Sequence, residues 1–246
     1  MAAACAPAGF RRWPSSTGSD VRSGRIRFVV VAAAATLGWM PRPQTPAATG
    51  AIQGRVVVND APDRLSRPAV AELADHKRDP VDRRRAVVYL KQVPQEAFGE
   101  VPVGRARMDQ RGEQFVPRIL AITVGTTVEF PNNDTTFHNV FSLSRVRRFD
   151  LGRYPPHKTG SIVFNKPGVV PVFCDIHSHM SAYILVFSHQ FFAVTDTEGR
   201  YTIPNVPAGT YTLRVWSELG EIERKDVTIP ERETIEANFQ VGRERP

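Results

Sequence analysis

The residues from Val172 to Met180 place a thiol, two imidazoles and a thioether close together in the chain. They read Val-Phe-Cys-Asp-Ile-His-Ser-His-Met, so Cys174, His177 and Met180 follow a Cys-x2-His-x2-Met spacing. Cys, His and a weak axial Met form the donor set that selects a blue-copper site. A single loop with this spacing can wrap one ion from three sides, and the fourth ligand must come from elsewhere in the chain.

His138 is the candidate fourth ligand. It follows a Pro-Asn-Asn-Asp turn and precedes Asn139. Taken singly, a buried Cys is usually a small apolar residue, a Met is core filler, and a His lies in a core or on a surface. The four residues together predict a metal site. Zn²⁺ also accepts one Cys and two His ligands, but the position of Met180 favours copper. His179, beside Met180, is an alternative ligand that would make the site more tetragonal.

The composition favours a β-protein. The chain has 246 residues with 20 Pro and 17 Gly, and it shows almost no long helical periodicity, which favours many short strands. The formal charge is +7, but residues 1–50 hold six Arg against one Asp and leave 26 Lys and Arg against 24 Asp and Glu in the remainder. A near-neutral remainder gives no reason to expect a nucleic-acid partner.

Residues 1–50 are predicted to be a signal peptide or leader. Arg25 and Arg27 precede the apolar run Phe28–Met40, and small residues follow it. This run is short for a transmembrane helix, so a membrane contact is expected only if the leader stays uncleaved. We therefore expect an exported protein of the bacterial periplasm or cell envelope. Cys5 lies in the leader, so the exported chain would keep Cys174 alone, without a disulfide partner.

Alternating apolar residues predict strands around both ligand segments. Residues 114–130 alternate on either side of a Gly-Thr turn, and further strands are expected at 139–143 and 182–187. Residues 161–165 and 169–174 are predicted to form a hairpin that turns at Lys166-Pro-Gly168. Residues 59–85, which include an isolated His76, and residues 92–110 are interpreted as polar connections.

The segment 144–160 is rich in positive charge. A solvated loop is the favoured interpretation, and a cationic docking patch for an acidic partner is the functional alternative. The cations are Arg145, Arg147, Arg148, Arg153 and Lys158, against the single acid Asp150.

The middle of the chain, over residues 108–188, resembles the cupredoxins, the family of plastocyanin and amicyanin. The spacing of its ligand loop is the short, amicyanin-like form, and exported bacterial plastocyanin-like proteins labelled methylamine utilisation proteins are similar to it. The matching motifs are Phe115-x-Pro117, Val124-Gly-x-x-Val128, Phe130-x-Asn132-x-Asp134, His138-Asn139-Val140 and the Cys174, His177 and Met180 loop.

This resemblance implies a Greek-key β-sandwich that binds one type 1 copper ion. The ligands would be His138, Cys174, His177 and Met180, and Asn139 would tie the two ligand loops together. The implied function is transfer of single electrons to a redox partner protein, such as an acidic protein or a cytochrome. The alternative is a copper-binding or delivery protein without an electron-transfer role. We expect no enzyme activity, because multicopper oxidases need several His-x-His pairs and this chain has only His177-Ser-His179.

The C-terminal segment resembles the carboxypeptidase regulatory-like, or transthyretin-like, sandwich. The motifs are Thr195-Asp-x-x-Gly199-x-Tyr201 and Val206-Pro-Ala-Gly-x-Tyr211-x-Leu213. That family opens with two strands that are found here at 54–58 and 86–91. We therefore expect a cupredoxin domain at 96–189 inserted into a smaller, split sandwich made of 51–95 and 190–246. The alternative is that 51–95 adds strands to the cupredoxin.

Overall fold

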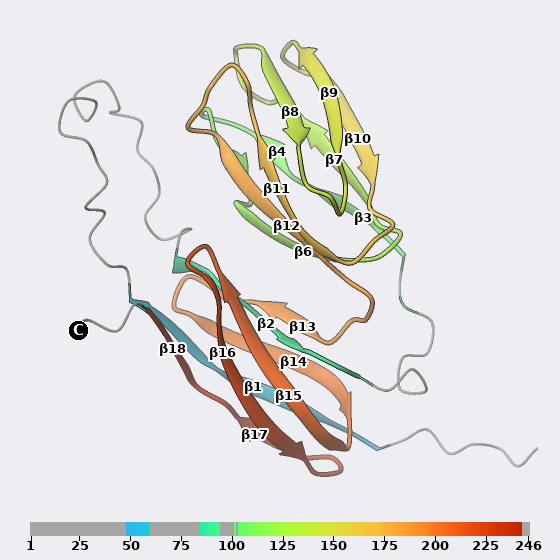
Figure 1. The fold of residues 1–246 in the computed structure, drawn as a ribbon, viewed down its shortest axis with the longest axis vertical. Helices are drawn as coiled ribbons and strands as arrows, with labels where there is room; N and C mark the ends of the chain where they lie inside the picture. The colour runs from blue at the N-terminus through green and yellow to red at the C-terminus, as the bar shows by residue number, and fades with distance from the viewer. Residues whose placement is uncertain (1–47, 60–83, 94–100, 102, 243–246) are drawn as a thin grey trace, which may run out of the picture. The chain divides into compact units, whose positions relative to one another are not determined.

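The described residues form β-strands joined by turns. The computed structural model describes residues 48–59, 84–93, 101 and 103–242, and none of the named elements in this part is a helix (Figure 1). The all-β class predicted from the sequence is confirmed. Within these ranges, no helix is long and apolar enough to cross a membrane. Residues 1–47 of the predicted leader, and His76, lie outside the described residues.

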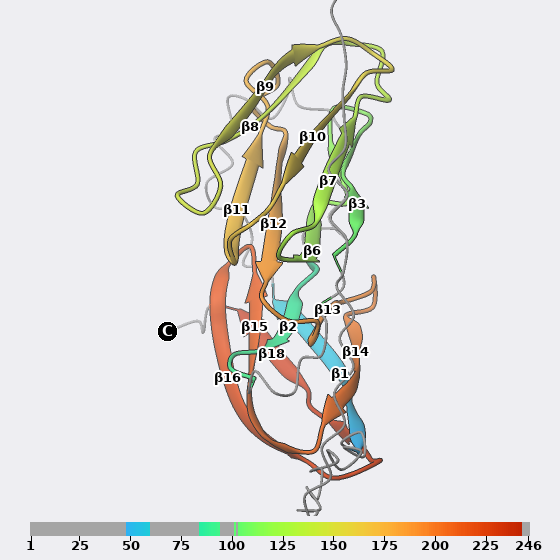
Figure 2. The ribbon, with the colours of Figure 1, turned by 90° about the vertical axis from the view of Figure 1, so that its right-hand side faces the viewer.

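The strands from β3 to β12 build the sandwich that carries the candidate ligands (Figure 2). One sheet has the order β10-β7-β3 and contains β3 (Arg105–Arg107), β7 (Thr127–Pro131) and β10 (Thr159–Val163). The other has the order β6-β12-β11-β8-β9 and contains β6 (Ile119–Thr123), β8 (His138–Ser142), β9 (Phe149–Tyr154), β11 (Gly168–Phe173) and β12 (Ser181–Phe187). A short pair joins β4 (Asp109–Gln110) to β5 (Phe115–Val116).

Apolar residues from the two sheets share one core. Val128 and Phe130 of β7 are fully buried with Val140 of β8 and Val172 of β11. The alternation seen in the sequence explains this packing, because successive side chains of a strand point to opposite faces of its sheet. Cys174 and Met180 belong to the same core, so the candidate site lies at one end of the sandwich.

The predicted hairpin between 161–165 and 169–174 is wrong. β10 pairs with β7, whereas β11 pairs with β12 and β8, so the chain crosses from one sheet to the other at Lys166–Gly168. Gly168 adopts a φ of 137° at this crossing, which glycine tolerates best. A hairpin and a pair of strands in two facing sheets have the same sequence pattern, because in either arrangement each strand buries one face in the core.

The segment 144–160 is not a continuous loop, as the sequence had suggested. It contains β9, which pairs antiparallel with β8. Phe149 is buried and Asp150 is exposed, which is the alternation of an edge strand. Similarly, the link 92–110 contains β3 and β4. The high charge of both segments concealed strands that expose one face.

The remaining strands form a second pair of sheets. One contains β1 (Thr49–Asn59), β14 (Arg200–Pro207), β17 (Thr234–Glu236) and β18 (Phe239–Gly242), with β14, β17 and β18 all paired to β1. The other has the order β13-β2-β15-β16 and contains β2 (Val87–Leu90), β13 (Phe192–Val194), β15 (Gly209–Ser217) and β16 (Gly220–Ile229).

The core of these two sheets bears on the predicted domain division. Val56 and Val88 lie in the same apolar core as Tyr211 and Leu213, whereas Val128 lies in the core that contains Cys174. This packing supports one sandwich made of 51–95 and 190–246. The division into domains, and the transthyretin-like family of the second sandwich, stay predictions.

Candidate metal centre

Two neighbouring strands bring the ligand segments together. His138 is the first residue of β8, and Cys174 directly follows β11. The two strands are antiparallel and pair Phe141 with Phe173, so the start of one lies beside the end of the other. The loop after Cys174 closes on itself, because the N–H of Met180 donates to the carbonyl of His177 at 2.9 Å.

The side chains of His138, Cys174 and His177 meet at this end. The Nδ1 atoms of the two histidines lie 3.0 Å apart, and the Cys174 Sγ atom lies 3.9 Å from Nδ1 of His138. Ligand atoms of all three residues lie within 4.8 Å of one another. His138 is fully buried and Cys174 is 4% exposed, whereas the His177 side chain is 20% exposed. The cluster is therefore buried on the strand side and open toward solvent at His177.

Met180 and His179 lie in different surroundings. Met180 is 1% exposed and packs in the same apolar core as Cys174. The Nε2 atom of His179 instead lies 3.3 Å from Oε2 of Glu113, with 23% of its side chain exposed. The structure thus brings Met180 into the core next to the cluster and turns His179 toward the carboxylate of Glu113.

Asp134 holds His138 from the side opposite the cluster. Its Oδ2 atom lies 2.9 Å from Nε2 of His138 and accepts the N–H of Glu113 at 2.7 Å. In the neutral ring, the proton on Nε2 then donates to the carboxylate and Nδ1 keeps its lone pair for the cluster. Burial would raise the pKa of Asp134, but hydrogen bonds from Glu113 and His138 outweigh it and the pKa is lowered.

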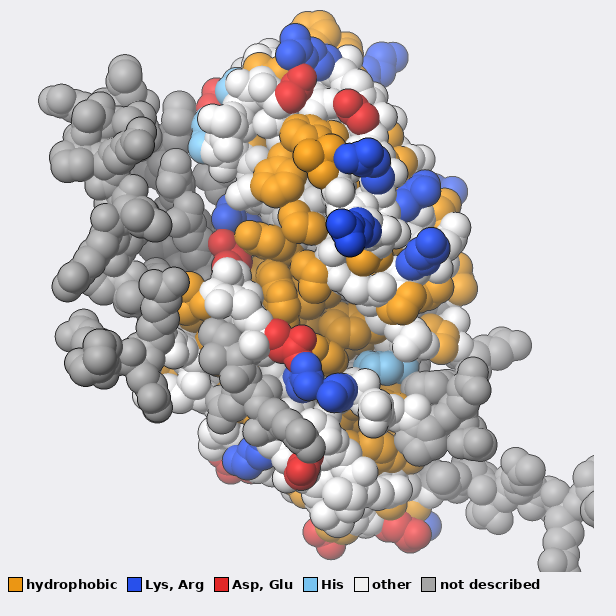
Figure 3. Space-filling view, in the orientation of Figure 1, with side chains coloured by type: hydrophobic (Ala, Val, Ile, Leu, Met, Phe, Trp, Pro, Cys, Tyr) orange, Lys and Arg blue, Asp and Glu red, His pale blue; other side chains and the backbone are white. Residues whose placement is uncertain are grey.

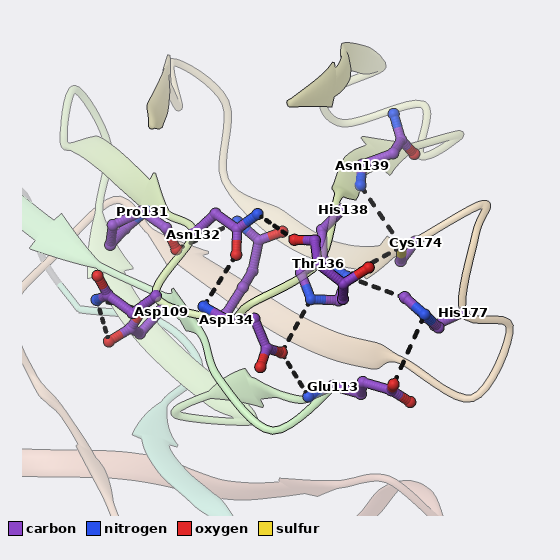
Figure 4. A network of polar contacts seen from close by, with 12 residues as sticks. Asp109, Glu113, Pro131, Asn132, Asp134, Thr136, His138, Asn139, Cys174 and His177 are labelled. Carbon is purple, nitrogen blue, oxygen red and sulfur yellow. Dashed lines mark hydrogen bonds and ion pairs between the residues drawn. The ribbon is translucent and has the colours of Figure 1, made fainter. Parts of the chain in front are cut away.

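The turn that carries Asp134 is braced by Asn132. The Nδ2 atom of this buried residue donates to the carbonyls of Thr136 at 2.9 Å and Tyr154 at 3.2 Å, and its Oδ1 atom accepts the N–H of Asp134 at 3.0 Å. Figure 4 shows this chain of contacts running from the turn to His138 and on to His177. The local fold therefore positions His138 through two successive side chains.

Asn139 contacts the cluster through its backbone. Its N–H donates to the Cys174 Sγ atom at 3.5 Å, and its side-chain Nδ2 donates to Oδ1 of Asp150 on β9 at 2.7 Å. The expected link between the two ligand segments is thus made by the main chain, and the side chain instead ties β8 to β9. An N–H directed at the sulfur stabilises a thiolate.

The positive charges of 144–160 separate into two groups. Arg145, Arg147 and Arg148 lie in the loop between β8 and β9, at the end of β8 opposite to His138. Arg153 belongs to β9 and pairs with Asp175, next to Cys174, at 2.9 Å. Figure 3 shows Lys and Arg side chains spread over the face formed by β8, β9 and β10. A docking patch made of the three loop arginines would therefore lie away from the metal cluster.

Glu113 is a site residue that the sequence did not indicate. It lies in the turn between β4 and β5 and reaches the ligand loop only through the fold. Asp134 was noted as a turn former and as part of the family motif, without a role toward His138. The one signal in the sequence was that Asp134 lies four residues before His138, a candidate ligand.

Comparisons with known proteins give partial matches. A family model described as polysaccharide lyase family 4, domain II, matches residues 169–237, a range that runs from β11 to just beyond β17. No curated protein matches. The chain is similar to a purple cupredoxin from Nitrosopumilus maritimus, at 23% identity and a TM-score of 0.32, over 33% of this chain and 99% of that one.

Two further solved structures are similar over a comparable part of the chain. A Cu-containing nitrite reductase from Thermus scotoductus SA-01 is 28% identical over 40% of this chain and 25% of its own, with a TM-score of 0.32. An amicyanin variant in its reduced Cu(I) form is 22% identical over 41% of this chain and 98% of its own, with a TM-score of 0.32. The function proposed below rests on the side chains of the site.

The donor set fits a copper ion. Metal bonds of about 2.0–2.1 Å to imidazole nitrogen and about 2.3 Å to thiolate sulfur place neighbouring donors of a four-coordinate ion about 3.3–3.6 Å apart. The observed separations of 3.0 Å between the two Nδ1 atoms and 3.9 Å between Sγ and Nδ1 fall on either side of this range. Since the ligand atoms of all three residues lie within 4.8 Å of one another, shifts of up to about an ångström would bring them onto one ion.

Proposed function

We propose that this protein is an exported electron carrier that holds one type 1 copper ion through His138, Cys174, His177 and Met180. The observation that carries the proposal is the pair of facing Nδ1 atoms, 3.0 Å apart, with a buried thiol 3.9 Å from one of them. Copper bound to such donors supplies a reversible one-electron step between Cu(I) and Cu(II). The leader pattern supports export, and we propose an electron carrier rather than an enzyme.

Each proposed ligand has a role that follows from its surroundings. Cys174 and Met180 supply soft sulfur donors, which suit Cu(I), and the two imidazoles also suit Cu(II). Asp134 fixes the ring orientation of His138, and the N–H of Asn139 favours the thiolate of Cys174. Because His138 and Cys174 lie at the ends of two paired strands, little movement is expected between the two oxidation states.

His177 is the proposed point of electron exchange with a partner protein. It is the most exposed of the clustered side chains, and its chain neighbour Ile176 is 38% exposed. Phe137, next to His138, is 52% exposed. Exposed apolar residues beside a reactive centre favour contact with another protein. The partner, an acidic protein or a cytochrome, is therefore expected to approach at this end of the sandwich.

The first test is spectroscopic. Cu(II) is added to the purified chain lacking the leader, and the visible and electron paramagnetic resonance spectra are recorded. An intense band near ~600 nm with narrow copper hyperfine splitting is expected for thiolate-bound copper, and Cys174→Ser should abolish it. His157→Asn is the control, because it removes an exposed imidazole outside the cluster. A band that persists in Cys174→Ser, or weak d–d absorption in the unchanged protein, would refute the proposal.

Copper delivery is the second candidate. The observation that favours it is the partial exposure of His177, beside the partly exposed side chains of Glu113 and His179. A delivery protein would release Cu(I) quickly to a competing chelator, whereas an electron carrier would retain the metal through many oxidation cycles. Comparison of the chelator-exchange rate with the rate of reversible oxidation distinguishes the two. Exchange faster than oxidation would favour delivery.

A further inference from the structure

The carboxylate of Glu113 lies between two imidazoles of the ligand loop. Its Oε2 atom is 3.3 Å from Nε2 of His179, and its Oε1 atom is 3.7 Å from Nε2 of His177. The three side chains are 28%, 23% and 20% exposed, respectively. Figure 4 shows His177 between the buried cluster and Glu113. These partly exposed side chains therefore line the mouth of the buried site, with the Nε2 atom of His179 itself buried beside Glu113.

Two imidazoles and one carboxylate form a donor set for a divalent metal ion. Such sites bind three protein ligands and leave a position open for water. Bonds of about 2.0–2.2 Å place neighbouring donors of a tetrahedral ion about 3.3–3.6 Å apart. The distances from Nε2 of His179 and Nε2 of His177 to Glu113, 3.3 and 3.7 Å, are close to this spacing. They end on different oxygens, so the carboxylate must turn to bring all three residues onto one ion.

The backbone holds Glu113 in this position. Gly112 and Glu113 have φ values of 61° and 53°, and a non-glycine residue adopts such a value uncommonly. The N–H of Glu113 donates to Oδ2 of Asp134, the same oxygen that binds His138. One carboxylate thus connects the surface donors to the buried ones.

We propose that Glu113, His179 and Nε2 of His177 form a second, outer site that captures Cu(II) and passes it to the buried cluster. This proposal rests on the proposed function, which requires copper to reach Cys174. His177 turns Nδ1 toward His138 and Nε2 toward Glu113. A neutral imidazole has a lone pair on one nitrogen only, so His177 ligates through one side at a time. Filling the buried cluster therefore releases the outer site.

The rate of copper loading tests this pathway. Substoichiometric Cu(II) is mixed with the reduced protein that lacks only the leader. The appearance of the thiolate band is followed by stopped flow. Glu113→Gln and His179→Ala are expected to slow its appearance by about tenfold or more, as for loss of a ligand or its support, with the same final amplitude. His157→Asn is the matched control, since its φ of 64° suits Asn. Unchanged loading rates in both variants would overturn the proposal.

A titration tests the outer site without the blue band. The double variant Cys174→Ser and His138→Gln removes two buried donors and keeps the three outer ones. We expect it to bind one Cu(II) by calorimetry, and addition of His179→Ala to weaken binding by about tenfold or more. Binding that does not respond to His179→Ala would overturn the outer site. Absence of the thiolate band in the unchanged protein would refute the proposed function instead, while this titration still decides the outer site.

Discussion

The Nε2 atom of His138 lies 2.9 Å from Oδ2 of Asp134, on the side of the ring opposite to the other donors. A carboxylate in this position fixes both the tautomer and the orientation of a ligating imidazole. Because the same oxygen accepts the N–H of Glu113 at 2.7 Å, the turn that precedes β8 and the turn between β4 and β5 are joined at the site.

Asp134→Asn is therefore expected to weaken Cu(II) binding by about 10- to 100-fold. The amide keeps the size of the side chain but removes the charge that fixes the proton on Nε2 of His138. Competition with a chelator of known affinity measures the change. Asp109→Asn is the control, since that carboxylate binds Asn133 in the same region without contacting His138. Equal affinities for the two variants would contradict the assigned role of Asp134.

Met180→Leu is expected to raise the reduction potential. Loss of the weak axial donor leaves the ion with fewer ligands in a more apolar surrounding, which costs the more highly charged Cu(II) more than Cu(I) and so favours the reduced state. A tenfold change in relative affinity corresponds to about 59 mV for one electron, and a shift of roughly this size or larger is expected in voltammetry. His179→Ala should leave the potential unchanged, because that ring faces Glu113. If His179→Ala alone shifts the potential, His179 rather than Met180 is the ligand.

The convergence of Cys174 and His177 could be anticipated from the sequence because the two residues are local neighbours. Cys174, His177 and Met180 lie in one short turn, so their spacing alone indicates convergence on an ion. His138 was identified by its place after the Pro-Asn-Asn-Asp turn and before Asn139. Glu113 reaches the loop only because β4 and β5 turn back beside it, and no pattern in the sequence reports a contact between such distant segments.

The strand pairings were less predictable than the strands. The alternation at 161–165 and 169–174 is the same whether the two strands pair with each other or face each other across a core. β9 escaped notice because Asp150 and Arg153 are charged, although Phe149 is buried. An edge strand of a sandwich buries only one row of side chains, and the polar side chains of its exposed row resemble those of a loop.

Gly54→Ala tests the predicted domain division. A Cβ atom at Gly54 would fall on the carbonyl oxygen of Ala237, whose N–H is held by the carbonyl of Gln53 at 2.9 Å. We expect a loss of about 2–3 kcal/mol in the free energy of unfolding, as for other forced overpacking. Because β1 shares its core with Tyr211 and Leu213, the loss should be seen as faster amide hydrogen exchange in β1 and β15.

Copper binding should survive this substitution at moderate denaturant concentration. Gly104→Ala is the matched control, because nothing lies within 4 Å of its added Cβ atom. Amide hydrogen exchange of β1 and β15 and the intensity of the thiolate band, both followed against urea concentration, measure the two regions separately. A parallel loss of both signals in Gly54→Ala would contradict a division in which 51–95 belongs with 190–246.

The buried, neutral ring of His189 is expected to make the folded protein less stable in mild acid. It is 5% exposed, its Nε2 atom lies 2.9 Å from the carbonyl of Leu90, and its Nδ1 atom accepts the N–H of Phe191 at 3.2 Å. These two contacts require the neutral ring with its proton on Nε2, since a second proton on Nδ1 would face the N–H of Phe191. Burial lowers the pKa of His189, and the bond to Leu90 opposes this only in part.

The unfolded chain therefore binds a proton on His189 at a higher pH than the folded chain does. The free energy of unfolding should be largest above the usual histidine pKa of about 6.5, and it should fall as the pH drops from there toward the lower pKa of the folded state. Urea unfolding at pH 7.5 and 5.5 measures the slope. In His189→Gln this pH dependence of the free energy of unfolding should vanish. In the control variant His157→Asn, which removes an exposed ring, it should remain. An identical slope in His189→Gln would show that another group is responsible.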